Sequence, residues 1–553
     1  MTAFVAVLLL VGVPVVYGSL RLSAPRRPWV VLSSWVGFLA LLIWAWPGEG
    51  ADFLYLKRFN LVLAAVTSLV LFFMKPGSGR APSRIRYRLV ILALAVLSLV
   101  NYLNYFSFHG ERTFLHLHDV AHYYLGAKYF EELGYEGLYT GMLRAEAELY
   151  DDHFKSLEAR DLESNELVPI QRILRRSETV KSVFTPQRWQ DFKADVALFR
   201  QRLGPQWATV LRDHGYNPTP VWTLIGSPLA NLVPAGSHTG VLWLAMLDPL
   251  LLVAMFVAVV WAFGLETGLL AIIYFCVLFG ATFGWTGGAF LRFPWLAATV
   301  GSVCCLQRGR HATAGALLAV ATALRVFPGF LAVGLLYKAA RKIIASRSMG
   351  PSYRHFFASF VVTMVALLAA SILLFGGLDS WSGFRDRIER QTETISPNIV
   401  GLTRVFDLRT EAGQVTSEEF RQLKDRRQSV YRTQLLLLAP LALFAVWLLS
   451  RELDDVGAAA LGIPLLVVCL NLAGYYYVVM LVVLLAHRSS PNKVALLFMG
   501  ETIIYTLMLF QEREATLYSL WSLTLIMVLG LIYSDTLWRA AARMRARGEL
   551  VNP

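Results

Sequence analysis

The residue types best suited to chemistry are concentrated in the run His116-Leu-His118-Asp119-Val-Ala-His122-Tyr123-Tyr124. A carboxylate such as Asp119 acts as a general base toward an acceptor hydroxyl when it lies within hydrogen-bond reach. His118 and His122 are four residues apart, so on a helix they would share a face at a spacing that suits metal ligands. No HExxH motif and no obvious second ligand cluster accompany them, so a metal site is not the favoured interpretation. An interfacial belt of Tyr and His at lipid-headgroup depth is the third hypothesis.

The composition places this run in a membrane protein. Of the 553 residues, 56% are hydrophobic and 16% are charged, whereas soluble domains carry about 25% charged residues. This excludes a disordered chain, a collagen-like repeat and a disulfide scaffold. The net charge of +13 comes mainly from basic blocks beside apolar stretches, at 75–88, 338–354 and 539–547. Such blocks are typical of cytoplasmic loops and argue against a nucleic-acid-binding surface.

Stretches long enough to cross a bilayer, about 20 apolar residues each, recur along the chain. They are predicted near residues 3–20, 29–46, 60–74, 88–106, 238–263, 266–283, 287–306, 314–337, 355–376, 434–450, 456–473, 475–487, 494–510 and 517–534. The sequence therefore predicts an all-α polytopic membrane protein with about 13–15 membrane segments and two extracytoplasmic segments, residues 107–237 and 377–433.

Basic residues in the short loops predict the orientation. The loops at 21–28 and 75–88 are rich in Arg and contain no acidic residue, so both are expected on the cytoplasmic side. The N-terminus is then outside, the C-terminal tail is cytoplasmic, and the run around Asp119 emerges on the outer face of the membrane.

The stretch 314–337 carries basic residues on both flanks, at 308–310 and 338–354. A single crossing cannot return to the side that it left, so we predict two half-length helices that meet at Arg325-Val-Phe-Pro328. Pro328 removes a backbone donor and breaks the helix. An arginine at membrane depth is costly and is usually functional or paired. The alternatives are one kinked span with a misassigned loop and a snorkelling Arg325.

Nucleotide-binding motifs are absent: the sequence contains no GxxxxGK[ST], and no GxGxxG between a strand and a helix. Chemistry is therefore expected outside or within the membrane. An activated substrate would have to reach that site without a nucleotide, and a lipid-linked donor meets this requirement.

Four segments resemble integral-membrane glycosyltransferases of the GT-C superfamily. Residues 119–139, which run from Asp119-Val-Ala-His-Tyr-Tyr to Gly137-Leu-Tyr139, are similar to the first outer loop of the polyprenyl-phosphate-mannose-dependent type, glycosyltransferase family 87. The other similar segments are Tyr216-Asn-Pro-Thr-Pro220 with Pro228-Leu-Ala, Ala314-Gly315 to Arg325-Val-Phe-Pro328, and Pro397-Asn398 to Gly401-Leu and Arg404. They follow the family order over about residues 85–490, with Arg325 where the family usually has Lys.

The resemblance implies a GT-C-like helical bundle that transfers a sugar, such as mannose, from a polyprenyl-phosphate donor to a glycan, glycolipid or protein of the cell envelope. Asp119 would be the catalytic base, and Arg325 would stabilise the phosphate leaving group. The further substrate-binding candidates are His118, His122, Tyr123, Tyr124, Lys128, Arg292, Asn398 and Arg404. We expect no cofactor, although the paired histidines would permit a divalent metal. The expected partners are the donor, the acceptor and membrane lipids, without nucleic acid.

Three domains are expected: extra N-terminal spans at 1–88, the GT-C-like core at 89–490, and C-terminal spans with a basic tail at 491–553. The three extra spans and the charged, helix-like segment at 140–215 depart from the family pattern. A transporter or a lipid-linked sugar flippase is the alternative function, because broken helices with buried charges suit it equally well. We interpret Asp248 and Glu501 as structural hydrogen-bonding groups and Tyr475–Tyr477 as an interfacial belt.

Overall fold

The computed structural model describes residues 53–74, 81–110, 112–150, 158–392, 398–406, 417–511 and 513–546. The predicted spans near 3–20 and 29–46, and Pro397 of the late motif, lie outside these residues. Within them, seven helices are long and apolar enough to cross a membrane. The protein is thus an all-α polytopic membrane protein, as the sequence predicts.

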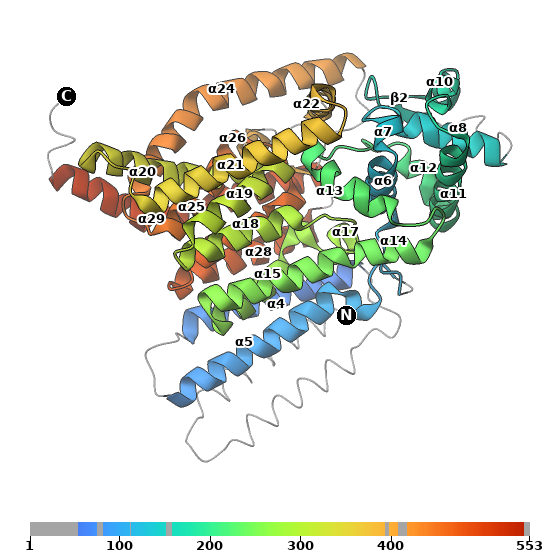
Figure 1. Ribbon diagram of the computed structural model, residues 1–553. Helices are drawn as coiled ribbons and strands as arrows, with labels where there is room; N and C mark the ends of the chain where they lie inside the picture. Colours follow the sequence, from blue (N-terminus) through green and yellow to red (C-terminus); the bar gives the residue numbers. More distant parts are fainter. Residues whose placement is uncertain are drawn as a thin grey trace, which may run out of the picture.

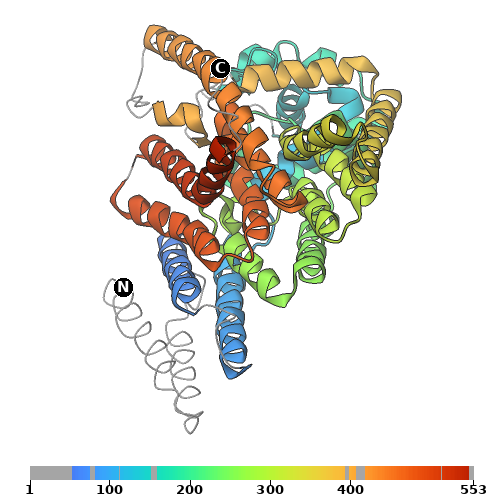
Figure 2. The same cartoon turned by 90° about the vertical axis from the view of Figure 1, so that its left-hand side faces the viewer.

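The long helices run side by side in one bundle (Figure 1) and are seen end-on in Figure 2. The seven candidate spans are Phe53–Phe73, Arg84–Tyr102, His238–Phe263, Pro351–Leu374, Gln428–Leu449, Pro491–Phe510 and Glu514–Arg543. The other predicted spans that fall within the described residues correspond to shorter or broken helices. For example, α16 (Leu265–Val277) and α18 (Pro294–Gln307) have 13 and 14 residues, too few for a full crossing.

The bundle contains the following helices and short strands along the chain: α4 (Phe53–Phe73), α5 (Ala81–Tyr102), η2 (Asn104–Phe106), α13 (Pro220–Asn231), α14 (His238–Ala245), α15 (Leu247–Phe263), α16, η4 (Phe279–Ala281), α17 (Phe283–Thr286), α18, α19 (His311–Leu324), η5 (Phe327–Leu331), α20 (Ala332–Ser346), α21 (Pro351–Leu374), α22 (Leu378–Thr392), β3 (Ile399–Val400), α23 (Leu402–Phe406), α24 (Ser417–Leu449), α25 (Asp455–Ala460), α26 (Gly462–Cys469), β4 (Leu472–Ala473), η6 (Gly474–Met480), α27 (Leu481–Ala486), α28 (Pro491–Phe510) and α29 (Glu514–Ala546). The extra N-terminal helix α4 packs on α28, and α5 packs on α16.

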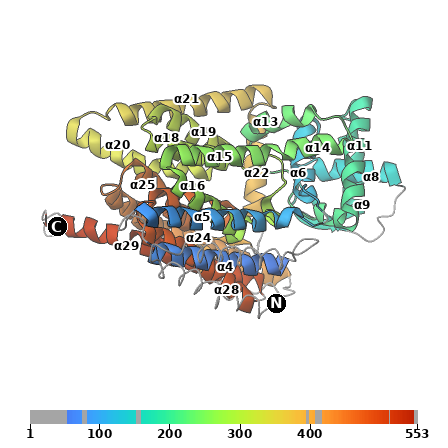
Figure 3. The ribbon, with the colours of Figure 1, turned by 90° about the horizontal axis from the view of Figure 1, so that it is seen from below.

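Residues 117–216 form a separate cap at one end of the bundle, coloured cyan to teal in Figures 1 and 3. The cap contains α6 (Leu117–Lys128), α7 (Phe130–Leu133), α8 (Leu138–Tyr150), β1 (Glu158–Asp161), β2 (Glu166–Pro169), α9 (Ile170–Leu174), α10 (Ser177–Lys181), α11 (Pro186–Leu203), η3 (Gly204–Gln206) and α12 (Trp207–Val210). The expectation of a helix-like segment at 140–215 holds for α8 and α11. It is wrong at 158–169, where β1 and β2 pair as an antiparallel hairpin.

The predicted helix break is present at Arg325. Helix α19 ends at Leu324, Arg325 has extended backbone, and η5 leads into α20. His311 at the start of α19 lies 3.2 Å from the Asp455 carboxylate, and Lys338 of α20 lies 2.8 Å from it. Both outer ends of the broken helix therefore lie on one side of the bundle, so the chain enters and returns.

Gly315 allows this hairpin to pack tightly on the bundle. A Cβ at this position would lie 2.0 Å from the backbone oxygen of Phe356 in α21, so no larger residue fits without movement of the helices. The Ala-Gly pair of the family-like motif thus has a packing role, which sets the position of the Arg325 break.

Candidate active site

Helix α6 carries the predicted base at its first turn. His116 caps the helix: its Nδ1 accepts a hydrogen bond from the backbone N–H of Asp119 at 3.1 Å. The backbone N–H of His116 in turn donates to the Gly288 oxygen at 3.0 Å. Gly288 has φ +67°, and a Cβ there would lie 1.9 Å from the Phe114 oxygen, so only glycine permits this approach. The start of α6 is thereby held against the loop that precedes α18.

That loop presents Arg292 to Asp119. The two side chains form an ion pair through Asp119 Oδ1. Only 14% of the Asp119 side chain and 13% of the Arg292 side chain are exposed. The turn is held from both sides: Trp222 donates to the Leu291 oxygen at 3.0 Å, and Asp248 accepts from the Arg292 N–H at 2.8 Å. Leu291 has φ +52°, a conformation that a branched residue adopts only when its surroundings impose it.

Asp248 also accepts from the Phe293 N–H at 3.1 Å. Glu501 similarly accepts from the Phe279 N–H at 2.8 Å. The interpretation of both acids as structural hydrogen-bonding groups is therefore confirmed. For Asp248 this structural role bears directly on the site, because the backbone that it holds carries Arg292.

Arg325 approaches the same helix one turn further on. Its Nη2 donates to the Tyr123 hydroxyl at 3.1 Å, and that hydroxyl donates to Asn217 Oδ1 at 3.2 Å. Asp119 and Tyr123 are four residues apart on α6 and share one face, with Cβ atoms about 5–6 Å apart. The structure therefore brings Asp119, Arg292 and Arg325 to a single face of α6.

Tyr475 and Tyr476 complete this cluster from η6. The Arg292 guanidinium lies 4.9 Å from the centre of the Tyr475 ring, and that of Arg325 lies 5.8 Å from the centre of the Tyr476 ring. The two rings thus line the charged cluster, a contact that the interfacial-belt interpretation did not include. The apolar residues that follow them in η6 and α27 concealed this role in the sequence.

Asn398 connects to the cluster through the backbone. Its oxygen accepts from the Gly474 N–H at 2.9 Å, and β3 pairs with β4 immediately beyond it. The late motif thus lies beside the start of η6. Arg404, predicted to bind substrate, donates to the Ala515 oxygen at 3.0 Å and joins α23 to α29.

Both arginines of the cluster retain unused donors. The Nε atoms of Arg292 and Arg325 are buried and have no hydrogen-bond partner among the described residues. A buried donor without an acceptor is costly unless a ligand satisfies it. The two guanidinium groups therefore keep donors available for an anionic ligand, beside the Asp119 carboxylate and the Tyr123 hydroxyl.

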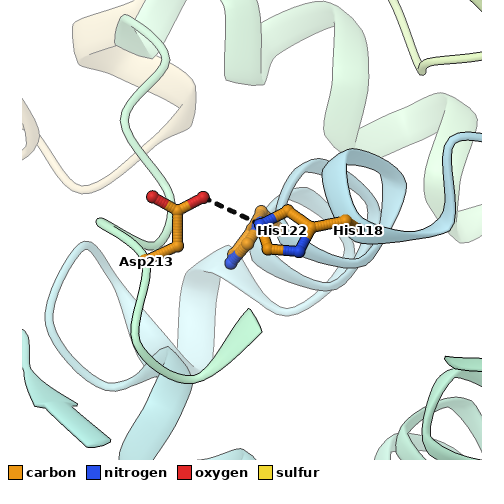
Figure 4. Close-up of side chains that lie close together, drawn as sticks. All are labelled: His118, His122 and Asp213. Atoms are coloured by element: carbon orange, nitrogen blue, oxygen red, sulfur yellow. Dashed lines mark hydrogen bonds and ion pairs between the residues drawn. The ribbon is translucent and has the colours of Figure 1, made fainter. Parts of the chain in front are cut away.

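The predicted residues His118 and His122 face a different direction, into the cap (Figure 4). His118 Nε2 lies 2.9 Å from Asp213 Oδ2, and His122 Nε2 lies 2.7 Å from the Tyr139 hydroxyl and 3.1 Å from the Val210 oxygen. Burial lowers the pKa of His122. Burial opposes ionisation of Asp213, but the hydrogen bond from His118 and the nearby His122 hold its pKa below the usual range.

Tyr124 and Lys128 are not brought to the charged cluster. Both are buried and bond to Asp195 of α11, Tyr124 through its hydroxyl at 3.2 Å and Lys128 through an ion pair at 2.9 Å. Lys128 Nζ also donates to the Val233 oxygen at 2.8 Å. These two candidates therefore join α6 to α11 within the cap and to the chain after α13.

Residues 216–471, a little under half of the chain, match the family model described as glycosyltransferase family 87. The match includes Arg292, Arg325, Asn398 and Arg404, and it begins after α6. No curated protein and no solved structure showed a significant match.

Proposed function

We propose that the chain is a glycosyltransferase of family 87, because residues 216–471 match that family's model, and that it uses a polyprenyl-phosphate sugar as donor. We propose that an acceptor hydroxyl of a glycan, glycolipid or protein receives the sugar on the outer face of the membrane. The observation that carries this proposal is the Asp119 carboxylate beside two buried arginines with unused donors.

The donor phosphate is proposed to bind between Arg292 and Arg325. Each guanidinium offers an unpartnered Nε–H, and planar guanidinium groups bind phosphate oxygens through parallel hydrogen bonds. Tyr475 and Tyr476 lie against the two guanidinium groups and hold their planes in place. The nucleoside diphosphate of a nucleotide sugar would need a larger cationic surface, whereas a single phosphate group matches the two arginines.

Asp119 is proposed to activate the acceptor. Its Oδ1 is engaged by Arg292, and among the described residues Oδ2 has no hydrogen-bond partner. As the acceptor oxygen attacks the anomeric carbon, its proton passes to Asp119. The bond between that carbon and the phosphate oxygen breaks, and the departing phosphate monoester carries the electron pair. Arg292 and Arg325 stabilise the negative charge that develops on it.

The test is sugar transfer by the purified full-length protein in lipid nanodiscs. Polyprenyl-phosphate mannose is supplied, and release of polyprenyl phosphate is measured with water or with envelope glycolipids as acceptor. We expect Asp119→Asn to lower the rate by about 100- to 10,000-fold. Asp191→Asn changes a partly exposed acid of α11 and should leave the rate unchanged.

Two outcomes would overturn the proposal. Normal turnover of Asp119→Asn would remove the assigned base. Failure of the wild-type protein to use any polyprenyl-phosphate sugar, together with transfer from a nucleotide sugar, would remove the assigned donor. Movement of the intact lipid-linked sugar across the bilayer without transfer would favour the flippase alternative.

A further inference from the structure

A second cluster of chemically capable side chains lies on the neighbouring face of α6. One ring nitrogen of His118, one of His122 and one carboxylate oxygen of Asp213 all lie within 4.8 Å of one another. The two histidines come from α6, and Asp213 follows α12. The cluster therefore joins two distant segments, since His118 and Asp213 are 95 residues apart in the sequence. Figure 4 shows the three side chains converging.

From this cluster we infer that the cap holds a divalent transition-metal ion, with His118, His122 and Asp213 as its protein ligands. Two imidazoles and one carboxylate form a ligand set that suits borderline-soft ions such as Zn²⁺. The inference concerns the cap alone and does not depend on the proposed donor.

Groups beyond the three ligands already orient the rings. The Val210 oxygen can only accept, so the 3.1 Å contact is a hydrogen bond when His122 carries its proton on Nε2. Nδ1 of the same ring then keeps its lone pair. Ligating histidines usually donate their other ring N–H to a carbonyl or carboxylate in this way. The Tyr139 hydroxyl, 2.7 Å from Nε2, adds a second polar contact at the same ring edge.

The exposure of the three side chains suits an ion that enters from solvent. His122 is buried, with 4% exposed, whereas the side chains of His118 and Asp213 are 31% and 45% exposed. Ligands around tetrahedral zinc are roughly 3.4 Å apart, given bonds of about 2.1 Å. The ligand atoms of the three residues lie within 4.8 Å of one another, so rotation of the two partly exposed side chains can bring them to that separation.

Such an ion would fix the first turns of α6. His118 directly precedes Asp119, and the ion would tie that turn to the chain after α12. With three protein ligands, it would keep at least one coordination position for water. The metal is thus proposed as a clamp that positions the Asp119 helix, and not as a group that contacts the donor phosphate.

The alternative is that His118 and Asp213 form only an ion pair. Metal content and affinity separate the two cases without any measurement of activity. The full-length protein is purified, stripped with a chelator and titrated with Zn²⁺. Co²⁺ is then added as a probe, whose visible absorption reports nitrogen and oxygen ligands.

We expect one equivalent of Zn²⁺ per chain and a rise in the thermal unfolding midpoint when it is restored. His118→Ala and Asp213→Asn should each weaken Zn²⁺ binding by at least about 100-fold, because even the loss of an outer-shell partner costs 10- to 100-fold. His238→Ala removes a histidine of α14 outside the cluster and should bind Zn²⁺ normally.

His118→Ala serves as the main variant because His118 is partly exposed and its loss leaves the interior packing unchanged. If the wild-type protein binds no Zn²⁺ or Co²⁺ above the level of the His118→Ala variant, the inference is wrong. Equal affinity in the wild-type protein and Asp213→Asn would also overturn it.

Discussion

Helix α6 contributes to two buried ion pairs, Asp119–Arg292 near its start and Lys128–Asp195 at its end. In the second pair the side chains are 4% and 0% exposed, and every charge has further partners. Asp195 accepts from Tyr129 at 2.7 Å and from the Gly236 N–H at 2.7 Å. The first pair is nearly as well buried, yet Arg292 Nε has no partner among the described residues.

The difference between the two pairs distinguishes residues that stabilise the fold from residues that can bind a ligand. A buried ion pair whose hydrogen-bonding groups are all satisfied has nothing left to offer a ligand. One with an unused donor has already met most of the cost of burying charge and can gain from an incoming anion. The satisfied Lys128 fits a scaffold role, whereas Arg292 and Arg325 combine an unused donor with a place beside Asp119 and Tyr123.

Breaking the satisfied pair should have the largest effect on stability. Lys128→Met leaves the Asp195 charge buried without its cation, which should destabilise the protein by about 3–5 kcal/mol. The shift of the thermal unfolding midpoint in detergent measures this. The double variant Lys128→Met/Asp195→Leu should recover part of the loss. A stable single variant that cannot bind donor would instead return Lys128 to the site.

Arg325→Gln should affect activity more than stability. Removing one stabilising cation costs about 100- to 1,000-fold in rate, or about 2.7–4 kcal/mol of transition-state energy. Among the described residues, the Arg325 side chain donates one hydrogen bond, to the Tyr123 hydroxyl. The unfolding midpoint should therefore change little. Kinetics with varied donor concentration measure the effect, with Arg385→Gln, at an exposed arginine of α22, as control. Equal loss of activity in both variants would contradict the assignment.

Asp248→Asn should give an intermediate effect. The carboxylate holds the backbone N–H groups of Arg292 and Phe293, and the amide can accept from only one of them without repulsion. We expect a loss of about 1–3 kcal/mol in stability and about 10- to 100-fold in kcat, because Arg292 shifts from its position. Reduced stability with unchanged kcat would show that the turn positions nothing that the reaction needs.

Glu148 of α8 is a carboxylate at the surface of the cap whose hydrogen-bonding groups also have partners. Its substitution should give the smallest effect. Burial opposes its ionisation, but hydrogen bonds from Lys181 and Trp189 lower the pKa of Glu148 to about 2. Its folded-state pKa lies below the unfolded value, so the stabilisation is complete above about pH 4.5 and is lost as the pH falls toward 2.

The expected contribution of Glu148 is about 1 kcal/mol or less, as for other surface pairs. Unfolding midpoints measured between pH 6 and pH 3 should fall less steeply in Glu148→Gln than in the wild-type protein. Identical slopes in the two proteins would show that this carboxylate adds nothing to the cap. Glu163→Gln, at a more exposed acid that is 54% exposed, is the matched control.

Local signals were sufficient for much of the fold and for part of the site. The apolar stretches predicted the long helices, and the basic flanks together with Pro328 predicted the broken helix at Arg325. The sequence also singled out Asp119 and Arg325, because a carboxylate after a span and an arginine within an apolar stretch are each costly and conspicuous, and the structure brings both to one face of α6.

The partners of these residues were not visible in the sequence. Tyr475 and Tyr476 looked like an aromatic belt because ring residues at a membrane interface and in a binding site share the same composition. Lys128 looked like a site residue because its partner, Asp195, is 67 positions away and lies on another helix. Asp213 gave no sign of joining His118 and His122 for the same reason.

The sequence by itself determined which segments are apolar, where the chain must break, and which charges are too costly to be incidental. These properties depend on composition and on spacing within a single helix. Only the tertiary structure decided which charges are satisfied. A carboxylate from α11 saturates Lys128, while a turn held by Asp248 and Trp222 brings Arg292 to Asp119 with a donor to spare. Whether a buried charge belongs to the scaffold or to the site depends on partners that are distant in the chain.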